Sequence, residues 1–149
     1  VHLNGILHTS TVPAALSDAA RGIAVKSAEK LLAALNYVGV IGIEFFVLPD
    51  GSLVANEMAP RVHNTGHWTE AACVISQFEQ HIRAVSGLNP GNTDRHSDCI
   101  MTNLIGDDIN DVPAWLSKKD CLVHLYGKTE ARRGRKMGHV TQLLHTGKA

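Results

Sequence analysis

The sequence predicts an α+β fold, with a helix and a hairpin in its first part and a mainly β second part. Three observations carry this prediction. Apolar residues at helical spacing run through 17–39, an Asp50-Gly51 pair separates two apolar runs, and short strand-like segments separated by turns fill 99–145. The Pro-, Gly- and Asn-rich segment 88–98 is typical of a connection between subdomains. We therefore expect two parts, residues 1–87 and 88–149.

The first two elements are an extended segment and a helix. Residues 1–12 read as extended, and Pro13 ends that element. Ser17 or Asp18 is a suitable N-cap for the helix, which should stop before Gly39. One stripe of this helix collects small and apolar side chains, namely Ala20, Ala24, Ser27, Leu31 and Leu35.

The segment 38–59 predicts a β-hairpin, because a tight turn needs positive φ and the glycine of Asp-Gly supplies it. A two-residue loop at this pair would place Phe46 opposite Ala55 and Glu44 opposite Glu57. Side chains directly opposite each other share a face of the sheet, with Cβ atoms about 5 Å apart.

Two glutamates side by side repel each other, and apolar neighbours increase the cost of burying them. A hard divalent cation such as Mg²⁺ or Mn²⁺ would offset this cost, and so would a shared proton. A register slipped by one residue would separate the two carboxylates, and a hairpin at the surface would leave both solvated. The hairpin alone leaves these alternatives open.

The loop after the hairpin favours the metal site. In "NEMAPRVHNTGHW", Arg61, His63, Asn64 and His67 follow Glu57 closely. Carboxylates with cationic and amide donors beside them are what a phosphate-transfer site requires. The next helix, 76–87, begins with a Ser76/Glu79 capping box and stops at Gly87. Its apolar stripe comprises Phe78, Ile82 and Val85.

The second part predicts strands at 99–106, 121–128 and 139–145, with a short helix near Trp115. The loop "YGKTEARRGRKMGH" is either a solvated basic hairpin tip or an anion site, in which glycine allows close backbone approach and arginine binds phosphate. Trp68, Trp115 and Phe78 are expected in the core. The five basic residues of the loop are Lys128, Arg132, Arg133, Arg135 and Lys136.

Composition narrows the class of protein. The 149 residues are 44% hydrophobic and carry 14 basic and 14 acidic side chains, so no net charge favours nucleic acid or an anionic membrane. No apolar run is long enough to span a membrane. Three cysteines, at positions 73, 99 and 121, disfavour a disulfide framework, and we expect reduced thiols in a cytoplasmic protein.

The motifs "EFFVLPDGSLVANEMAPRVHNTGHWT", "SQFEQHIRAV" and "YGK…GRKMGH" together resemble the C-terminal part of the N5-carboxyaminoimidazole ribonucleotide synthetases. The resemblance implies the second half of an ATP-grasp domain at 1–87 and a small β-rich domain at 88–149. It also implies that MgATP and bicarbonate form carboxyphosphate, which carboxylates 5-aminoimidazole ribonucleotide. A homodimer is common in the family.

The resemblance also implies roles for single residues. Glu44 and Glu57 match the metal-binding acids, and Asn56 and Glu57 match a pair at the ATP site. Arg61 matches the arginine that steadies bicarbonate or carboxyphosphate. The remaining matches lie near the acceptor: His63 and Asn64 beside the aminoimidazole ribonucleotide, and Lys128 and Arg135 at its 5′-phosphate.

The sequence departs from the family's pattern in two respects. Ala59 stands where many ATP-grasp enzymes have a metal-binding Asn. The chain opens at Val1 on an apparent strand, and the Gly-rich lid, nucleotide-binding lysines and adenine hinge of the family are not found in it. We therefore expect a fragment that is inactive alone. The alternatives are another ATP-grasp carboxylase or ligase, which "HNTGH" and "GRKMGH" disfavour, and a nucleotide- or phosphate-binding module without turnover.

Overall fold

The computed structural model describes residues 1–144 and divides the chain into two compact units. Unit 1 comprises Val1–Ala14, Trp68–Val74 and the chain from Asp94 onward, and unit 2 comprises Ala15–His67 and Ile75–Thr93. Both contain helices and strands, so the predicted α+β class is confirmed. The expected parts 1–87 and 88–149 follow each other in sequence, whereas the compact units interleave.

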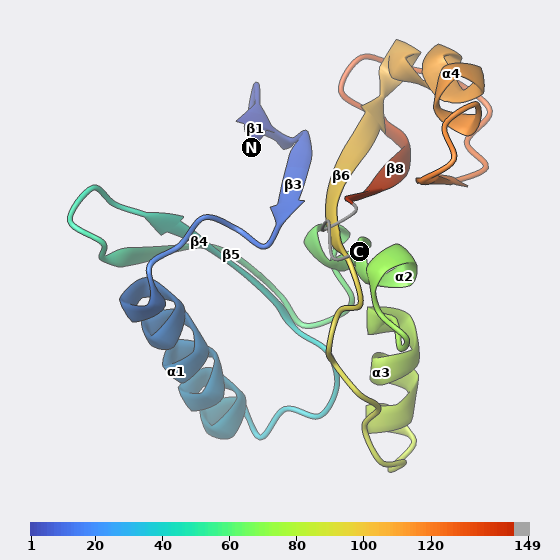
Figure 1. Cartoon of the computed structure of the whole chain (residues 1–149). Helices are drawn as coiled ribbons and strands as arrows, with labels where there is room; N and C mark the ends of the chain where they lie inside the picture. The colour runs from blue at the N-terminus through green and yellow to red at the C-terminus, as the bar shows by residue number, and fades with distance from the viewer. Residues whose placement is uncertain (145–149) are drawn as a thin grey trace, which may run out of the picture. The chain divides into compact units, whose positions relative to one another are not determined.

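Unit 1 is built on a four-stranded antiparallel sheet with the strand order β3-β6-β8-β7. Strand β6 (Asp98–Ile105) and strand β8 (Lys136–Leu144) form its centre (Figure 1). Strand β7 (Cys121–Leu125) and strand β3 (Thr9–Val12) form its edges. The three strands predicted in the second part are confirmed within the described residues, which exclude His145.

The first twelve residues fold differently from the prediction. They were expected to form one extended element, but β1 (His2–Leu3) and β2 (Ile6–Leu7) form a small hairpin before β3 begins. Asn4 and Gly5 form its turn with φ of 51° and 76°. Asn and Gly are the residues that adopt this left-handed conformation most readily, which explains the reversal.

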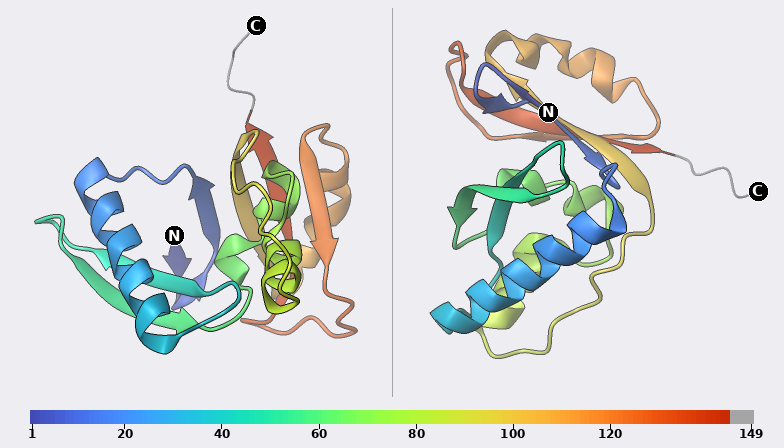
Figure 2. Two further views of the ribbon diagram at one scale, coloured as in Figure 1. Left: turned by 90° about the horizontal axis from the view of Figure 1, so that it is seen from below. Right: turned by 90° about the vertical axis from the view of Figure 1, so that its left-hand side faces the viewer.

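The centre of the sheet of unit 1 is buried on both faces: alternate residues of β6 from Cys99 to Asn103 are buried, and five successive residues of β8, Met137–Thr141, are buried. The short helix α4 (Val112–Leu116) contacts β7, as Figure 2 shows. It follows the 3-10 helix η2 (Gly106–Asp111), which confirms the helix predicted near Trp115. The largest fully buried apolar side chains of the described residues are Met101, Leu104, Met137, Val140 and Cys99.

Unit 2 contains helix α1 (Asp18–Leu35), which contacts both strands of a two-stranded hairpin (Figures 1 and 2). The Ser17 hydroxyl accepts a hydrogen bond from the Ala20 amide at 3.2 Å, so Ser17 is the N-cap. The helix ends at Leu35, with Asn36 at φ of 46° as its C-cap, so it stops before Gly39 as predicted. An asparagine in the left-handed region is a common C-terminal cap.

Helix α3 (Gln77–Val85) begins at Ser76 and is followed by Gly87 with φ of 70°, both as predicted. Its apolar stripe is not buried: Phe78 is 37%, Ile82 60% and Val85 53% exposed. The expectation that Phe78 lies in the core is therefore wrong. Its ring stacks on His67 with centroids 5.5 Å apart.

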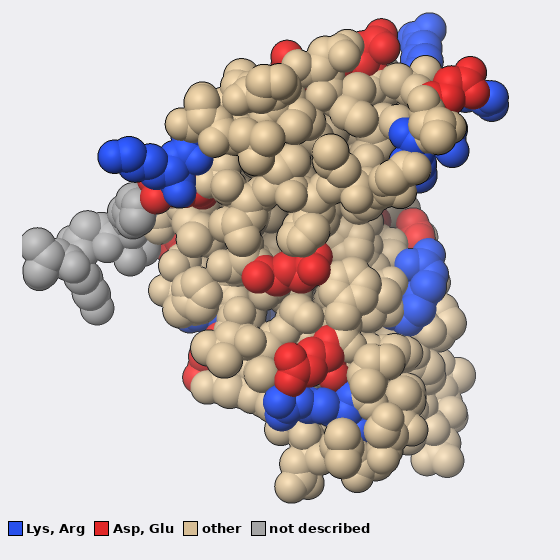
Figure 3. All heavy atoms as spheres, turned by 90° about the vertical axis from the view of Figure 1, so that its right-hand side faces the viewer, with Lys and Arg blue, Asp and Glu red and all other residues tan. Residues whose placement is uncertain are grey.

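Charged side chains on the face drawn in Figure 3 lie in small groups; most combine acidic and basic atoms, and one near the centre is acidic alone. This distribution agrees with the equal numbers of acidic and basic residues. Among the described residues, no helix combines the length and apolar character that a membrane crossing requires.

The three cysteines are free thiols, as predicted. Burial, with a smaller contribution from the neighbouring Cys73, raises the pKa of Cys99 to about 11. Thiolate is the reactive form, so at about pH 8 we expect Ellman's reagent to modify the more exposed Cys121 first and Cys99 last. The same three thiols should react together in denaturant. Equal rates for Cys99 and Cys121 in the folded chain would contradict this expectation.

Candidate functional site

The site in unit 2 is built on the hairpin of β4 (Gly42–Val47) and β5 (Leu53–Ala59). The predicted pairing of Glu44 with Glu57 is confirmed, although the predicted pairing of Phe46 with Ala55 is wrong. The turn is one residue longer than expected, because the Leu48 amide donates to the Ser52 carbonyl. This longer turn shifts the register near the hairpin tip by one residue.

A β-bulge at Asn56 restores the register at the two glutamates. Phe45 pairs with Ala55 and Glu44 pairs with Glu57, so Asn56 is the extra residue of β5. Its side-chain amide donates a hydrogen bond to the Glu44 carboxylate at 3.0 Å. Because of the bulge, Asn56 and its neighbour Glu57 are both directed toward Glu44.

His63 completes a cluster with the two glutamates. Its Nε2 lies 3.3 Å from Glu57 Oε1, and its Nδ1 lies 3.7 Å from Glu44 Oε1. One ligand atom from each residue lies within 4.8 Å of the others, so the three side chains can converge on one cation. The Glu44 side chain is 13% exposed and that of Glu57 53%, so the cluster has a buried side and a solvent side.

Gln77 holds His63 in place from helix α3. Its carbonyl oxygen accepts from the His63 amide at 2.9 Å, and its amide donates to the His63 carbonyl at 2.8 Å. The same amide nitrogen lies 2.9 Å from Nδ1 of His67. Sequence reasoning did not identify Gln77, because a polar residue in the first turn of a helix resembles an ordinary solvated position. Gln77 is only 7% exposed, and this burial distinguishes it from a solvated residue, but the sequence does not show it.

Gly42 allows the close approach of His63 to the hairpin. A Cβ at this position would lie 2.6 Å from the His63 Cβ, well inside contact distance. The absence of a side chain at the start of β4 therefore determines where the imidazole sits. The hydroxyl of Thr65, two residues further along the loop, lies within hydrogen-bond distance of its Nδ1, at 2.9 Å.

The other predicted residues of the loop lie close to this cluster in sequence. Strand β5 ends at Ala59, and the Arg61 amide donates to the Ala59 carbonyl, so the chain turns at Pro60 as expected. Arg61 is exposed, and its guanidinium donates to the Val62 carbonyl at 2.9 Å. Asn64 begins a single 3-10 turn, η1 (Asn64–Gly66). The loop thus brings a guanidinium and an amide into the sequence that directly follows Glu57.

A hollow of about 430 Å³ lies between α1 and the hairpin. Its lining is mainly apolar and includes Leu31, Ile43 and Phe45, and it reaches Asn56 and Glu57 at the site. An apolar hollow that ends at polar groups is a typical arrangement for binding a small molecule.

The two predicted phosphate-binding residues lie in unit 1, in the loop between β7 and β8. The Lys128 ammonium donates to the Lys136 carbonyl at 2.5 Å and lies 5.6 Å from the centre of the Tyr126 ring. Arg135 donates to the Glu130 carbonyl at 3.1 Å. Lys136 is the first residue of β8 and directly follows Arg135. The Lys128 ammonium and Arg135 therefore both lie at the start of β8.

Two family models match the chain. The model of the ATP-grasp domain matches residues 1–78. The model of the phosphoribosylaminoimidazole carboxylase C-terminal domain matches residues 99–149.

Proteins of known sequence and structure resemble the chain over nearly all its length. An N5-carboxyaminoimidazole ribonucleotide synthase from Brucella melitensis is 71% identical over 96% of the chain, and one from Bacillus subtilis is 46% identical over 95%. A structure of the Aspergillus clavatus synthase with ADP and 5-aminoimidazole ribonucleotide is 36% identical, with a TM-score of 0.90, and covers 97% of the chain and 40% of that protein. The chain spans 40% and 37% of the two curated relatives' lengths.

Proposed function

Since this chain belongs to the ATP-grasp family, we propose that it forms part of an enzyme that carboxylates 5-aminoimidazole ribonucleotide with ATP and bicarbonate. The product is N5-carboxyaminoimidazole ribonucleotide, an intermediate of purine biosynthesis. The observation that carries this proposal is the cluster of Glu44, Glu57 and His63 in a chain 71% identical to a synthase of that name. Arg61 and Asn64 flank His63 in the sequence.

Glu44 and Glu57 would hold Mg²⁺, or Mn²⁺, with the Asn56 amide hydrogen-bonded to Glu44. Carboxylate oxygens are the ligands that these hard cations prefer, so the donor set fits. A bound cation would neutralise charge on the ATP phosphates. The apolar hollow beside Asn56 and Glu57 supports a nucleotide position on the α1 side of the hairpin.

The proposed chemistry has two steps. A bicarbonate oxygen attacks the γ-phosphorus of ATP, releasing ADP and leaving carboxyphosphate. The amine of the ribonucleotide then attacks the carboxyl carbon, the bond to the phosphate oxygen breaks, and the amine loses a proton. Arg61 would steady the anions of both steps through its guanidinium, whose planar set of N–H donors suits carboxylate and phosphate oxygens.

Four residues match the acceptor site of the family, and we propose the same roles for them in this chain. His63 and Asn64 would contact the aminoimidazole ribonucleotide, and Lys128 and Arg135 would bind its 5′-phosphate. Gln77 holds both backbone groups of His63, and the Thr65 hydroxyl lies 2.9 Å from its Nδ1. Together these contacts support a fixed imidazole, and a positioned side chain loses little freedom on binding. We also propose a cytoplasmic location, which the free thiols support, and a homodimeric enzyme.

A chimaera tests the proposed function directly. This chain would replace the matching 143 residues of the Brucella melitensis synthase. We expect ADP release that requires both bicarbonate and 5-aminoimidazole ribonucleotide, at a rate close to that of the parent synthase. The 149-residue chain alone should release little ADP.

Two results would contradict the proposal. A folded chimaera that binds ATP without releasing ADP would indicate a binding module. A folded chimaera that releases ADP only with a different acceptor amine would indicate another ATP-grasp ligase.

A further inference from the structure

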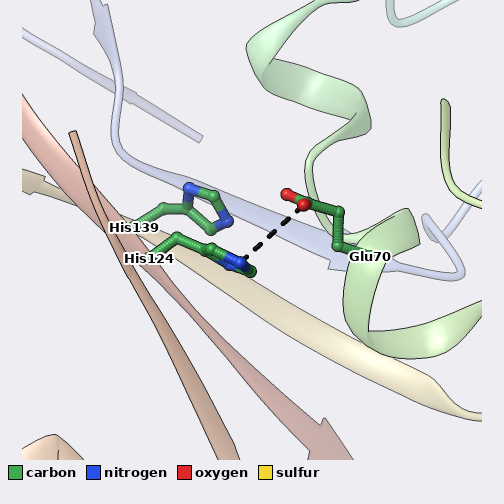
Figure 4. A group of neighbouring side chains, drawn as sticks. All are labelled: Glu70, His124 and His139. Atoms are coloured by element: carbon green, nitrogen blue, oxygen red, sulfur yellow. Dashed lines mark ion pairs between the residues drawn. The ribbon is translucent and has the colours of Figure 1, made fainter. Parts of the chain in front are cut away.

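A second cluster of potential metal ligands lies in unit 1, and the proposed reaction does not use it. Glu70 comes from α2 (Thr69–Ala72), His124 from β7 and His139 from β8. Figure 4 shows both imidazoles beside the Glu70 carboxylate. One ligand atom of each residue lies within 4.8 Å of the others, and His124 Nε2 lies 3.7 Å from Glu70 Oε1.

The sheet places the two histidines directly opposite each other. His124 and His139 are paired in register, and their ring centroids are 5.0 Å apart with 31° between the ring planes. Two protonated imidazoles in this position would be like charges facing each other, which destabilises a sheet. Two neutral imidazoles instead each present a nitrogen lone pair, which is the form that binds metals.

Tyr126 lies within hydrogen-bond distance of one ring nitrogen of His139. Its hydroxyl lies 2.9 Å from Nδ1, so Nδ1–H can donate to the Tyr126 oxygen and leave the lone pair on the buried Nε2. Histidines that bind metals generally donate their second ring nitrogen to such a partner, which fixes the tautomer and the orientation of the ring.

The exposure of the three side chains fits a site that a cation can enter. His139 is only 2% exposed, whereas the side chains of Glu70 and His124 are 28% and 45% exposed. A cation would therefore reach His124 and Glu70 from solvent and contact His139 at the buried end. Water would complete its coordination on the open side.

We propose that Glu70, His124 and His139 form a binding site for a divalent transition metal ion of the zinc class. Two imidazoles and one carboxylate are a common ligand set for Zn²⁺, and imidazole suits Zn²⁺, Ni²⁺ and Fe²⁺ better than Mg²⁺. This site differs in chemistry from the Glu44–Glu57–His63 cluster, which has two carboxylates. The inference does not depend on the proposed carboxylase activity.

The bound ion would join α2 to the strands β7 and β8. Helix α2 has four residues and contacts β8, but it belongs to a segment far from both strands in sequence. An ion coordinated by Glu70 and the two histidines would hold this segment against the sheet. An ion that binds only the folded form of a protein stabilises the folded form.

The test is a titration of the tag-free chain with Zn²⁺. Calorimetry measures the binding, and the thermal unfolding midpoint is measured with and without the ion. The chain would carry Glu57→Gln, so that the cluster of unit 2 does not contribute. We expect one Zn²⁺ per chain and a higher unfolding midpoint. Glu70→Gln and His124→Gln should each weaken binding at least about tenfold, and Tyr126→Phe about 10- to 100-fold.

The matched controls are Glu130→Gln and His96→Gln, two exposed residues of the same unit outside the cluster. Both should bind Zn²⁺ as the Glu57→Gln chain does. His139 is not varied, because it is only 2% exposed and its replacement would change the packing of the core as well as the ligand set. Two results would overturn the proposal: no stoichiometric Zn²⁺ binding, or equal binding by Glu70→Gln, His124→Gln and the two controls.

Discussion

Replacing Glu57 with Gln in the chimaera is expected to reduce ADP release by about 10²- to 10³-fold, because the site loses a charge that would stabilise the transferring phosphoryl group. The amide has nearly the shape of the carboxylate, so the hairpin should fold unchanged. The measurement is kcat for ADP release at saturating ATP over a range of Mg²⁺ concentrations. A higher Mg²⁺ requirement should accompany the lower rate, since Glu57 is a proposed ligand.

Glu79→Gln is the matched control for this variant. Glu79 is an exposed glutamate of unit 2 whose carboxylate pairs with Arg83 one helical turn away. Its replacement should leave the rate and the Mg²⁺ requirement as they are. Wild-type rates in Glu57→Gln, with circular dichroism showing an intact fold, would mean that the paired glutamates have only a structural role.

Replacing Gly138 with Ala is expected to cost about 3 kcal/mol of stability, at the upper end for overpacking. A Cβ at Gly138 would lie 2.3 Å from the His124 carbonyl oxygen and 3.2 Å from the Leu125 Cα. Both atoms belong to the backbone of the neighbouring strand, so β7 would have to move away from β8. The measurement is the free energy of unfolding in denaturant, followed by the fluorescence of Trp68 and Trp115, which both lie in unit 1.

Met137→Leu is the control for this substitution. Met137 precedes Gly138 in β8 and is 1% exposed, and leucine has a similar volume. Its replacement should cost less than about 1.5 kcal/mol. If Gly138→Ala unfolds at the same denaturant concentration as the wild-type chain, β7 and β8 would accommodate a Cβ at position 138, and the expectation would be wrong.

The pairing of Glu44 with Glu57 could be predicted from the sequence, but the reason for it could not. Asp50-Gly51 located the turn, while its length depends on a hydrogen bond between Leu48 and Ser52 that the residue types do not specify. The bulge at Asn56 compensates for that extra residue. The predicted pair is therefore correct because two local irregularities cancel.

Long-range contacts account for what the sequence did not predict. Gln77 and Gly42 control His63 through packing between segments that are separate in the chain. The exposed stripe of α3 shows the same limit, because periodicity predicts which side chains share a face but not whether anything covers it. Capping residues such as Ser17 and Ser76 act locally, and these predictions were confirmed.

The pairing of β3 with β6 has a consequence for the order of folding. Thr9 pairs with Thr102 and Val12 with Cys99, so a strand near the start of the chain meets its partner only about 90 residues later. Closing such a long loop is entropically costly, and contacts at this separation slow folding. During synthesis on the ribosome, all of unit 2 would emerge before β6, the partner strand of β3, has been made. Unit 2 can therefore fold first, and the sheet of unit 1 can assemble only after β6 and β8 have been synthesised.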